Sequence, residues 1–164
     1  MDNNGTIRCA ELLDHGFLPQ FIKGAGIYKV RISPKAHRRE LHGPSPIIHI
    51  GKGSEKWGGL TWRMGEFVAA ALGFLGVPHS SGIRFNDVRD KIDLTVRDLL
   101  IDWERCAPSR TAQRERAEFD RFSRALNPSD MELLLKVRHK VLCEYDELRF
   151  GIGKPYPLLS QRRG

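Results

Sequence analysis

The fold is decided by two short stretches, Gly-Ala-Gly-Ile-Tyr-Lys-Val-Arg-Ile at residues 24–32 and Ile-Ile-His-Ile-Gly-Lys-Gly-Ser at residues 47–54. Both are rich in β-branched residues, which favour extended strands. Each stretch carries one ring among apolar neighbours, Tyr28 in the first and His49 in the second. If the two strands pair, a phenol and an imidazole face each other from adjacent strands.

Helices are predicted on either side of these strands along the chain. Apolar residues recur at the spacing of one helical face from about Leu60 to Leu75. A highly charged segment with a thin stripe of apolar residues predicts a mostly solvated helix nearer the C-terminus. A capping box at Ser129-Asp-Met-Glu132 predicts the start of a last helix. The predicted helices cover residues 8–22, 60–75, 110–126 and 129–150.

Three segments between these elements have weaker patterns. Residues 33–46 are dense in proline and positive charge and lack an apolar period, so we expect an exposed loop. Glycine, proline and serine between residues 76 and 82 predict a turn that contains His79, with residues 83–85 extending from it. Residues 92–103 carry apolar side chains at spacings that fit a helix and also a strand, and periodicity alone does not choose between them.

Length and composition narrow the class of protein. A chain of 164 residues is long enough for one domain with a real core. Lys and Arg outnumber Asp and Glu by 27 to 20, which favours a polyanionic partner such as nucleic acid. The 3 cysteines have no spacing suited to structural zinc. No stretch is long and apolar enough for a membrane span and the N-terminus lacks a signal-peptide pattern, so we expect a cytoplasmic protein without a membrane partner.

The two strands resemble the signature strands of the GIY-YIG nuclease family. The first motif reads Gly26-Ile27-Tyr28, and the second reads His49-Ile50-Gly51 where the family usually has a tyrosine in the first position. The resemblance extends over about residues 20–160 of a single domain, 1–164. It implies an α+β fold with a small, mainly antiparallel, three-stranded sheet flanked by helices. It also implies a third strand near residues 99–106.

Phosphodiester hydrolysis needs a base to activate water and positive charge to stabilise the transition state. Tyr28 and His49 are candidates for the base, and imidazole starts with the better pKa. Each alone could be an ordinary packed residue, but together with the Gly51-Lys52-Gly53 turn they favour a function. Lys52 and its neighbouring amides can approach an anion. Arg63 offers phosphate a rigid donor fork, and the family has a catalytic arginine on the helix after its second motif.

A nuclease of this kind also needs a metal-binding carboxylate, which the family supplies as one glutamate on a later helix. Within residues 130–149, helical geometry puts Glu144 inside the apolar face, where an unpaired carboxylate is costly. We therefore predict that Glu144 holds Mg²⁺ or Mn²⁺. Family members usually carry this glutamate earlier, so Glu115 and Glu118 are rivals, while Glu147 lies at the edge of the apolar face.

The sequence thus predicts a metal-dependent endonuclease that binds and cleaves nucleic acid, DNA rather than RNA. His79 and Arg84 are predicted to contact the substrate beside Lys52, and Trp57 and Trp62 are available for base stacking. One alternative is a catalytically inactive nucleic-acid-binding domain on the same fold. Another is an interaction module that binds a protein through the helix at 110–126.

Overall fold

The computed structural model describes residues 3–14 and 22–129. Its centre is a four-stranded antiparallel sheet with the strand order β1-β4-β2-β3. The predicted α+β class is confirmed, with one strand more than expected. The strands are β1 (Asn4–Arg8), β2 (Gly26–Ile32), β3 (Ile47–Gly53) and β4 (Leu99–Arg105).

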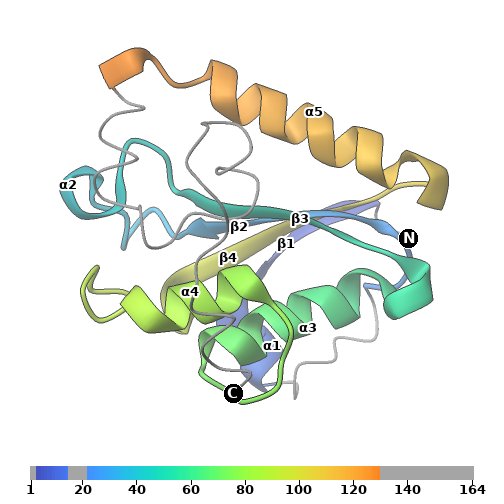
Figure 1. Cartoon of the computed structure of the whole chain (residues 1–164), viewed down its shortest axis with the longest axis horizontal. Coiled ribbons are helices and arrows are strands. Elements are labelled where there is room, and N and C mark those ends of the chain that lie inside the picture. Colours follow the sequence, from blue (N-terminus) through green and yellow to red (C-terminus); the bar gives the residue numbers. More distant parts are fainter. Residues whose placement is uncertain (1–2, 15–21, 130–164) are drawn as a thin grey trace.

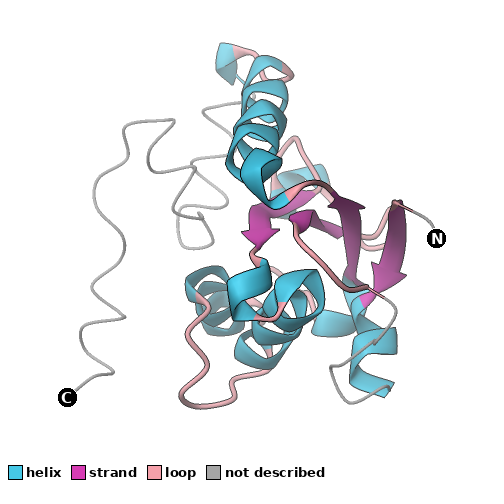
Figure 2. Ribbon diagram, turned by 90° about the vertical axis from the view of Figure 1, so that its right-hand side faces the viewer, coloured by secondary structure: helices cyan, strands magenta, loops and turns pink. Residues whose placement is uncertain are grey.

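Helices cover both faces of this sheet. Figures 1 and 2 show α5 along one face, and α1, α3 and α4 together on the other. The main core lies between the sheet and α3, and a smaller apolar cluster of Ile50, Phe119 and Phe122 lies under α5. The helices are α1 (Cys9–Asp14), α2 (Arg39–His42), α3 (Gly59–Ala71), α4 (Ser80–Val88) and α5 (Thr111–Arg124), with 3₁₀ turns at Glu55–Trp57, Val96–Asp98 and Pro108–Arg110.

The predicted pairing of the two signature strands is confirmed. Tyr28 on β2 lies opposite Gly51 on β3, and Val30 lies opposite His49, with a register shift after Val30. A Cβ at Gly51 would lie 2.7 Å from the His49 Nε2 and 2.9 Å from the Tyr28 Oη. The missing side chain at Gly51 is therefore what allows the two rings to meet.

Only the second half of the ambiguous segment 92–103 forms a strand, β4, in agreement with the strand expected near residues 99–106. The charged helix is confirmed as α5, with Phe119 and Phe122 buried as the apolar stripe predicted. The long helix α3 ends at Ala71, earlier than expected, because Gly73 adopts a φ of +89°. The predicted last helix lies outside the described residues, together with Glu144 and Glu147.

Other predictions were wrong in part. Residues 80–88 form helix α4, where the sequence indicated a turn followed by an extension; its N-cap is a histidine, which is not a usual capping residue. Strand β1 was missed because only Ile7 of its five residues is buried, which leaves almost no alternation to detect. The loop at 33–46 contains helix α2, whose His42 is buried with its Nε2 2.7 Å from the carbonyl oxygen of Ile92.

No helix within residues 3–14 and 22–129 is long and apolar enough to cross a membrane.

Candidate active site

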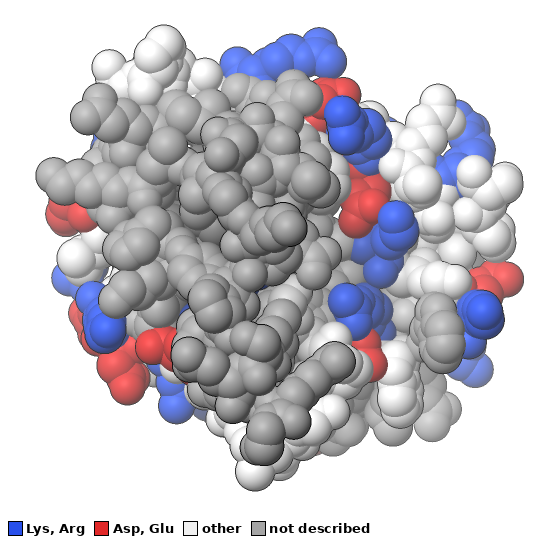
Figure 3. All heavy atoms as spheres, in the orientation of Figure 1, with Lys and Arg blue, Asp and Glu red and all other residues white. Residues whose placement is uncertain are grey.

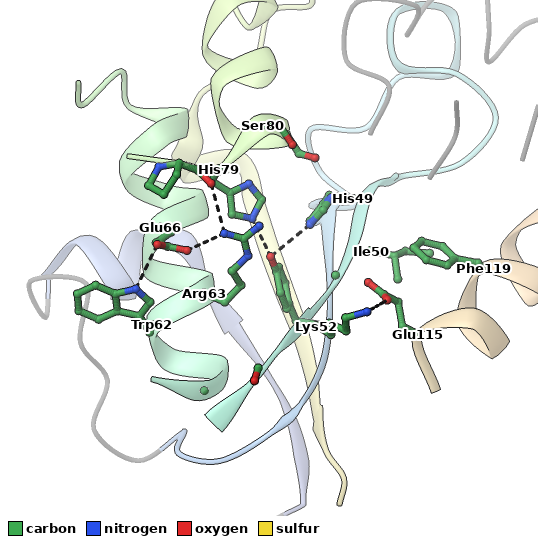
Figure 4. A pocket seen from close by; sticks show the side chains of 16 residues that line it. His49, Ile50, Lys52, Trp62, Arg63, Glu66, His79, Ser80, Glu115 and Phe119 are labelled. Atoms are coloured by element: carbon green, nitrogen blue, oxygen red, sulfur yellow. Dashed lines mark hydrogen bonds and ion pairs between the residues drawn. The ribbon is translucent and has the colours of Figure 1, made fainter. Parts of the chain in front are cut away.

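A pocket of about 660 Å³ opens beside the second signature strand. Strand β3 and Tyr28 of β2 form one wall, and the first two turns of α3, the start of α4 and the part of α5 up to Phe119 form the rest. Figure 4 shows side chains from these elements pointing toward one another across the space. Five of the residues predicted to act in catalysis or to contact the substrate line this pocket together, and so do Trp62 and the rival ligand Glu115: the five are Tyr28, His49, Lys52, Arg63 and His79.

The phenol of Tyr28 is the centre of the group. It lies 1% exposed, with its Oη 3.2 Å from the His49 Nε2 and 2.8 Å from the His79 Nε2. Phe67, which is fully buried, stacks on the His49 ring and meets the His79 ring edge-on. Phe67 thus packs against both imidazole rings.

The hydrogen bond from Gly82 to His79 determines which atoms donate in the hydrogen bonds among His79, Tyr28 and His49. The His79 Nδ1 accepts the backbone N–H of Gly82 at 3.3 Å, because His79 caps the N-terminus of α4. In a neutral imidazole the proton then resides on Nε2 and is donated to the Tyr28 Oη. The phenolic hydrogen is left to point at the His49 Nε2, which acts as an acceptor.

This chain of hydrogen bonds ends at His49. With Nε2 accepting, the neutral His49 ring carries its proton on Nδ1. That atom is buried and has no hydrogen-bond partner among the described residues. A buried donor without a partner is costly, and in native structures it is often found where a site has a function.

Burial keeps all three rings uncharged at neutral pH. Burial and, after it, the positive charges of Arg63 and Arg84 together lower the pKa of His49 to about 3. Burial also lowers the pKa of His79, with His49 and Arg63 contributing, and it raises the pKa of Tyr28 although Arg63 opposes this. His49 is therefore a neutral acceptor for the phenol.

Arg63 is held in the pocket by Glu66, one turn further along α3. Its Nη1 lies 2.7 Å from the Glu66 Oε2, and the other carboxylate oxygen accepts the indole N–H of Trp62 at 3.1 Å. Glu66 was not predicted from the sequence. Its spacing of three residues from Arg63 and four from Trp62 was the available signal, because such residues are neighbours on a helix surface.

Lys52 is paired with a carboxylate from the opposite wall. Its Nζ lies 2.9 Å from the Glu115 Oε2 on α5. Of the two rival glutamates named from the sequence, Glu115 lines the pocket, whereas Glu118 is 4% exposed and pairs with Lys29 and Arg121 outside it.

Arg84 was predicted to bind substrate, and the structure does not bring it into the pocket. It lies on α4 with 2% of its surface exposed and is not among the lining residues. Its positive charge still acts on the site, because it lowers the pKa of His49. Arg84 therefore belongs to the electrostatic surroundings of the pocket.

The described residues include carboxylate oxygens that could bind a metal ion, but they do not form a complete set of metal ligands. Among residues 3–14 and 22–129 there is no group of three or more His, Cys, Asp or Glu that could hold one. Two carboxylates do line the pocket, Glu66 and Glu115. Mg²⁺ commonly takes one or two protein carboxylates and fills its other positions with water and phosphate oxygens. The donors thus fit Mg²⁺ in kind, provided that one of the two ion pairs opens.

Comparisons with protein-family models, with curated proteins and with solved structures found no match for this chain.

Proposed function

We propose that the chain is an endonuclease that hydrolyses phosphodiester bonds in nucleic acid, DNA rather than RNA, with Mg²⁺ or Mn²⁺ as cofactor. One observation carries the proposal. The Tyr28 Oη lies between two neutral imidazoles, at 2.8 Å from His79 and 3.2 Å from His49, in a pocket that also contains Arg63. This arrangement suits removal of a proton from water beside a phosphate.

Tyr28 and His49 would act as one base. The phenol oxygen accepts a proton from the attacking water while its own proton passes to the His49 Nε2. As the hydroxide forms its bond to phosphorus, the bond from phosphorus to the leaving sugar oxygen breaks, and that oxygen takes up a proton from solvent. His49 then returns its proton through Tyr28 to solvent. The His49 pKa of about 3 disfavours the resulting imidazolium. A bound phosphate would raise that pKa, because a nearby negative charge stabilises the charged ring.

His79 and Arg63 would support this step in different ways. His79 donates to the Tyr28 Oη and so stabilises negative charge on that oxygen. Arg63 presents its guanidinium to phosphate oxygens, where a planar fork of donors matches the geometry of the anion. Glu66 fixes the orientation of that fork through its contact with Nη1.

The charge balance of the pocket gives a reason for the cation. Among the described lining residues, Lys52 and Arg63 are each paired with a carboxylate, Glu115 and Glu66. A phosphate entering this pocket meets little net positive charge, and a divalent cation would neutralise the charge on its oxygens. Of the two carboxylates that line the pocket, Glu115 is the better candidate for the metal ligand. Its partner Lys52 is 46% exposed and is able to turn from Glu115 to the phosphate. Glu144 stays a prediction outside the described residues.

The test is a cleavage assay with labelled DNA and RNA oligonucleotides, single- and double-stranded, in Mg²⁺, in Mn²⁺ and in excess chelator. We expect cleavage that stops in chelator and falls at least about a hundredfold in Tyr28→Phe, the range for loss of a general base. Oligonucleotide affinity should change little in that variant, because only the phenolic oxygen is lost. Full activity of Tyr28→Phe would remove the phenol from the mechanism.

The second candidate is a nucleic-acid-binding domain that does not cleave. It is favoured by the pairing of both cationic lining residues and by the lack of a three-ligand metal group among the described residues. Binding without cleavage in any metal would establish it. Figure 3 shows basic and acidic side chains mixed on the face it displays, so we expect moderate, salt-sensitive affinity in either case.

A further inference from the structure

We propose that Trp62 stacks on an unpaired nucleobase at the rim of the pocket, so that the preferred substrate is a single strand rather than a duplex. The inference rests on the proposed function, since it requires that the pocket binds nucleic acid. It names the substrate class and the residue that selects it.

Trp62 is unusual among the large apolar side chains of α3. Leu60, Met64, Phe67 and Val68 are buried in the core, whereas Trp62 is 52% exposed and lines the pocket. In Figure 4 its indole lies at one end of the pocket and Phe119 at the other, with Arg63 between them. An indole in this position presents a flat apolar surface next to the residue assigned to the phosphate.

The indole is fixed in place before any ligand binds. Its Nε1 donates to the Glu66 Oε1 at 3.1 Å, which holds the far edge of the ring. At its base, a Cβ on Gly58 would lie 2.7 Å from the Trp62 Cβ and 3.0 Å from its Cγ, so the backbone packs directly against the side chain. A ring that is already immobilised loses little conformational entropy on stacking.

The carboxylate of Glu66 links the indole of Trp62 to Arg63, the residue assigned to the phosphate. Glu66 binds Trp62 through Oε1 and Arg63 through Oε2. The two side chains are thus set at a fixed spacing, one suited to a base and the other to a phosphate. A strand whose phosphate meets Arg63 places a neighbouring base within reach of the ring.

This geometry distinguishes single strands from duplexes. Inside a duplex both faces of each base are covered by the adjacent base pairs, so stacking on Trp62 would require unstacking first. In a single strand the face is available, and every base has one, so stacking tolerates any sequence. Since Lys52 and Arg63 are both paired with carboxylates, phosphate attraction alone is modest, and stacking becomes a large share of the affinity.

The experiment measures dissociation constants by fluorescence anisotropy for one labelled oligonucleotide as a single strand and as a duplex, in chelator so that nothing is cleaved. We expect Trp62→Leu to weaken single-strand binding about tenfold, within the range for loss of one stacked base, and to change duplex binding less than about twofold. Trp62→Phe should retain most of the single-strand affinity. Phe74→Leu is the matched control, because Phe74 is 58% exposed yet does not line the pocket.

The possible failures are distinguishable. Equal losses for single strand and duplex in Trp62→Leu, or no loss at all, would overturn the stacking proposal while leaving the nuclease intact. A wild-type protein that binds neither form would overturn the proposed function and the stacking proposal together. Circular dichroism of each variant checks that the fold is unchanged, as expected for a substitution at an exposed position.

Discussion

Tyr28 and His79 are 51 positions apart in the sequence and joined by a hydrogen bond of 2.8 Å between the phenol oxygen and the imidazole Nε2. The same histidine caps α4 through its Nδ1. One side chain thus fixes the start of a helix and the hydrogen-bond direction of the candidate base. The two roles call for different substitutions to separate them.

We predict that His79→Asn separates these roles. Asparagine is a good N-cap but is too short to reach the Tyr28 Oη, so this variant keeps the cap and loses the buried hydrogen bond and the packing against Phe67. Cleavage should fall about tenfold or more, because the phenol loses its donor. His79→Ala loses the same contacts and the cap as well, so it should be as inactive as His79→Asn and about 1 kcal/mol less stable than it. Urea unfolding and cleavage rates measured on both variants check this, and equal stability losses would show that capping is not the structural role.

Stability should fall in mild acid. Burial, with help from Arg63 and Arg84, holds the pKa of His49 in the folded state at about 3, against an ordinary value of 6.5. Between these values the unfolded chain binds a proton that the folded chain does not, so stability is lost as the pH falls below about 6.5 and is unaffected by His49 at higher pH. The loss by pH 5 should be at most about 2 kcal/mol from His49, because pH 5 lies about 1.5 units below the ordinary pKa and each unit is worth about 1.4 kcal/mol.

Denaturant unfolding at several pH values measures this slope, and His49→Asn is the variant to compare. The slope should become shallower without vanishing, because burial also lowers the pKa of His79. An identical slope in the variant would mean that His49 titrates normally.

We predict that Gly51→Ala separates the Tyr28 and His49 rings. The added carbon would lie 2.7 Å from the His49 Nε2 and 2.9 Å from the Tyr28 Oη, so at least one ring must move. Overpacking of this kind costs roughly 1–3 kcal/mol, and cleavage should fall with the lost contact. Gly76→Ala is the control, because Gly76 has a φ of +79° and nothing within 4 Å of an added Cβ. It should lose stability through backbone strain and keep full activity.

Much of the fold could be predicted because its strongest patterns are local. The β-branched stretches became β2 and β3, and the apolar period after residue 60 became α3. Strand β1 has a single buried residue, and α4 is capped by a histidine, so neither carries the usual signal. Tertiary pairing with β4 makes β1 a strand, and its five residues alone could not indicate this.

The sequence predicted those residues of the site that lie in or next to a recognisable motif. Tyr28, His49 and Arg63 were named from their motifs, and they do line one pocket. The pairing of Lys52 with Glu115 joins residues 63 positions apart, and no sequence pattern indicates it. For Arg84 the prediction from the sequence was wrong. Its positive charge near a motif was interpreted as a substrate contact at the surface, but the side chain is buried.

The last prediction concerns the carboxylate that holds the cation. Glu115 lines the pocket and meets the ammonium group of Lys52 at 2.9 Å. Glu115→Gln keeps the shape of the side chain and removes the charge that a divalent cation needs. We expect the Mg²⁺ concentration for half-maximal cleavage to rise at least about tenfold. Oligonucleotide affinity in chelator should stay equal or increase, because Lys52 loses a competing anion.

Glu118→Gln is the control for that measurement, since Glu118 lies one turn later on α5, outside the pocket, and pairs with Lys29, Arg114 and Arg121. It should lower the free energy of unfolding, because three cationic groups lose a buried partner, and should leave the Mg²⁺ requirement unchanged. Glu144→Gln completes the set. If that variant alone raises the Mg²⁺ requirement, Glu144 is the ligand that the sequence predicted and Glu115 serves only to hold Lys52. A rise in both variants would mean that two carboxylates share the ion, which Mg²⁺ sites commonly allow.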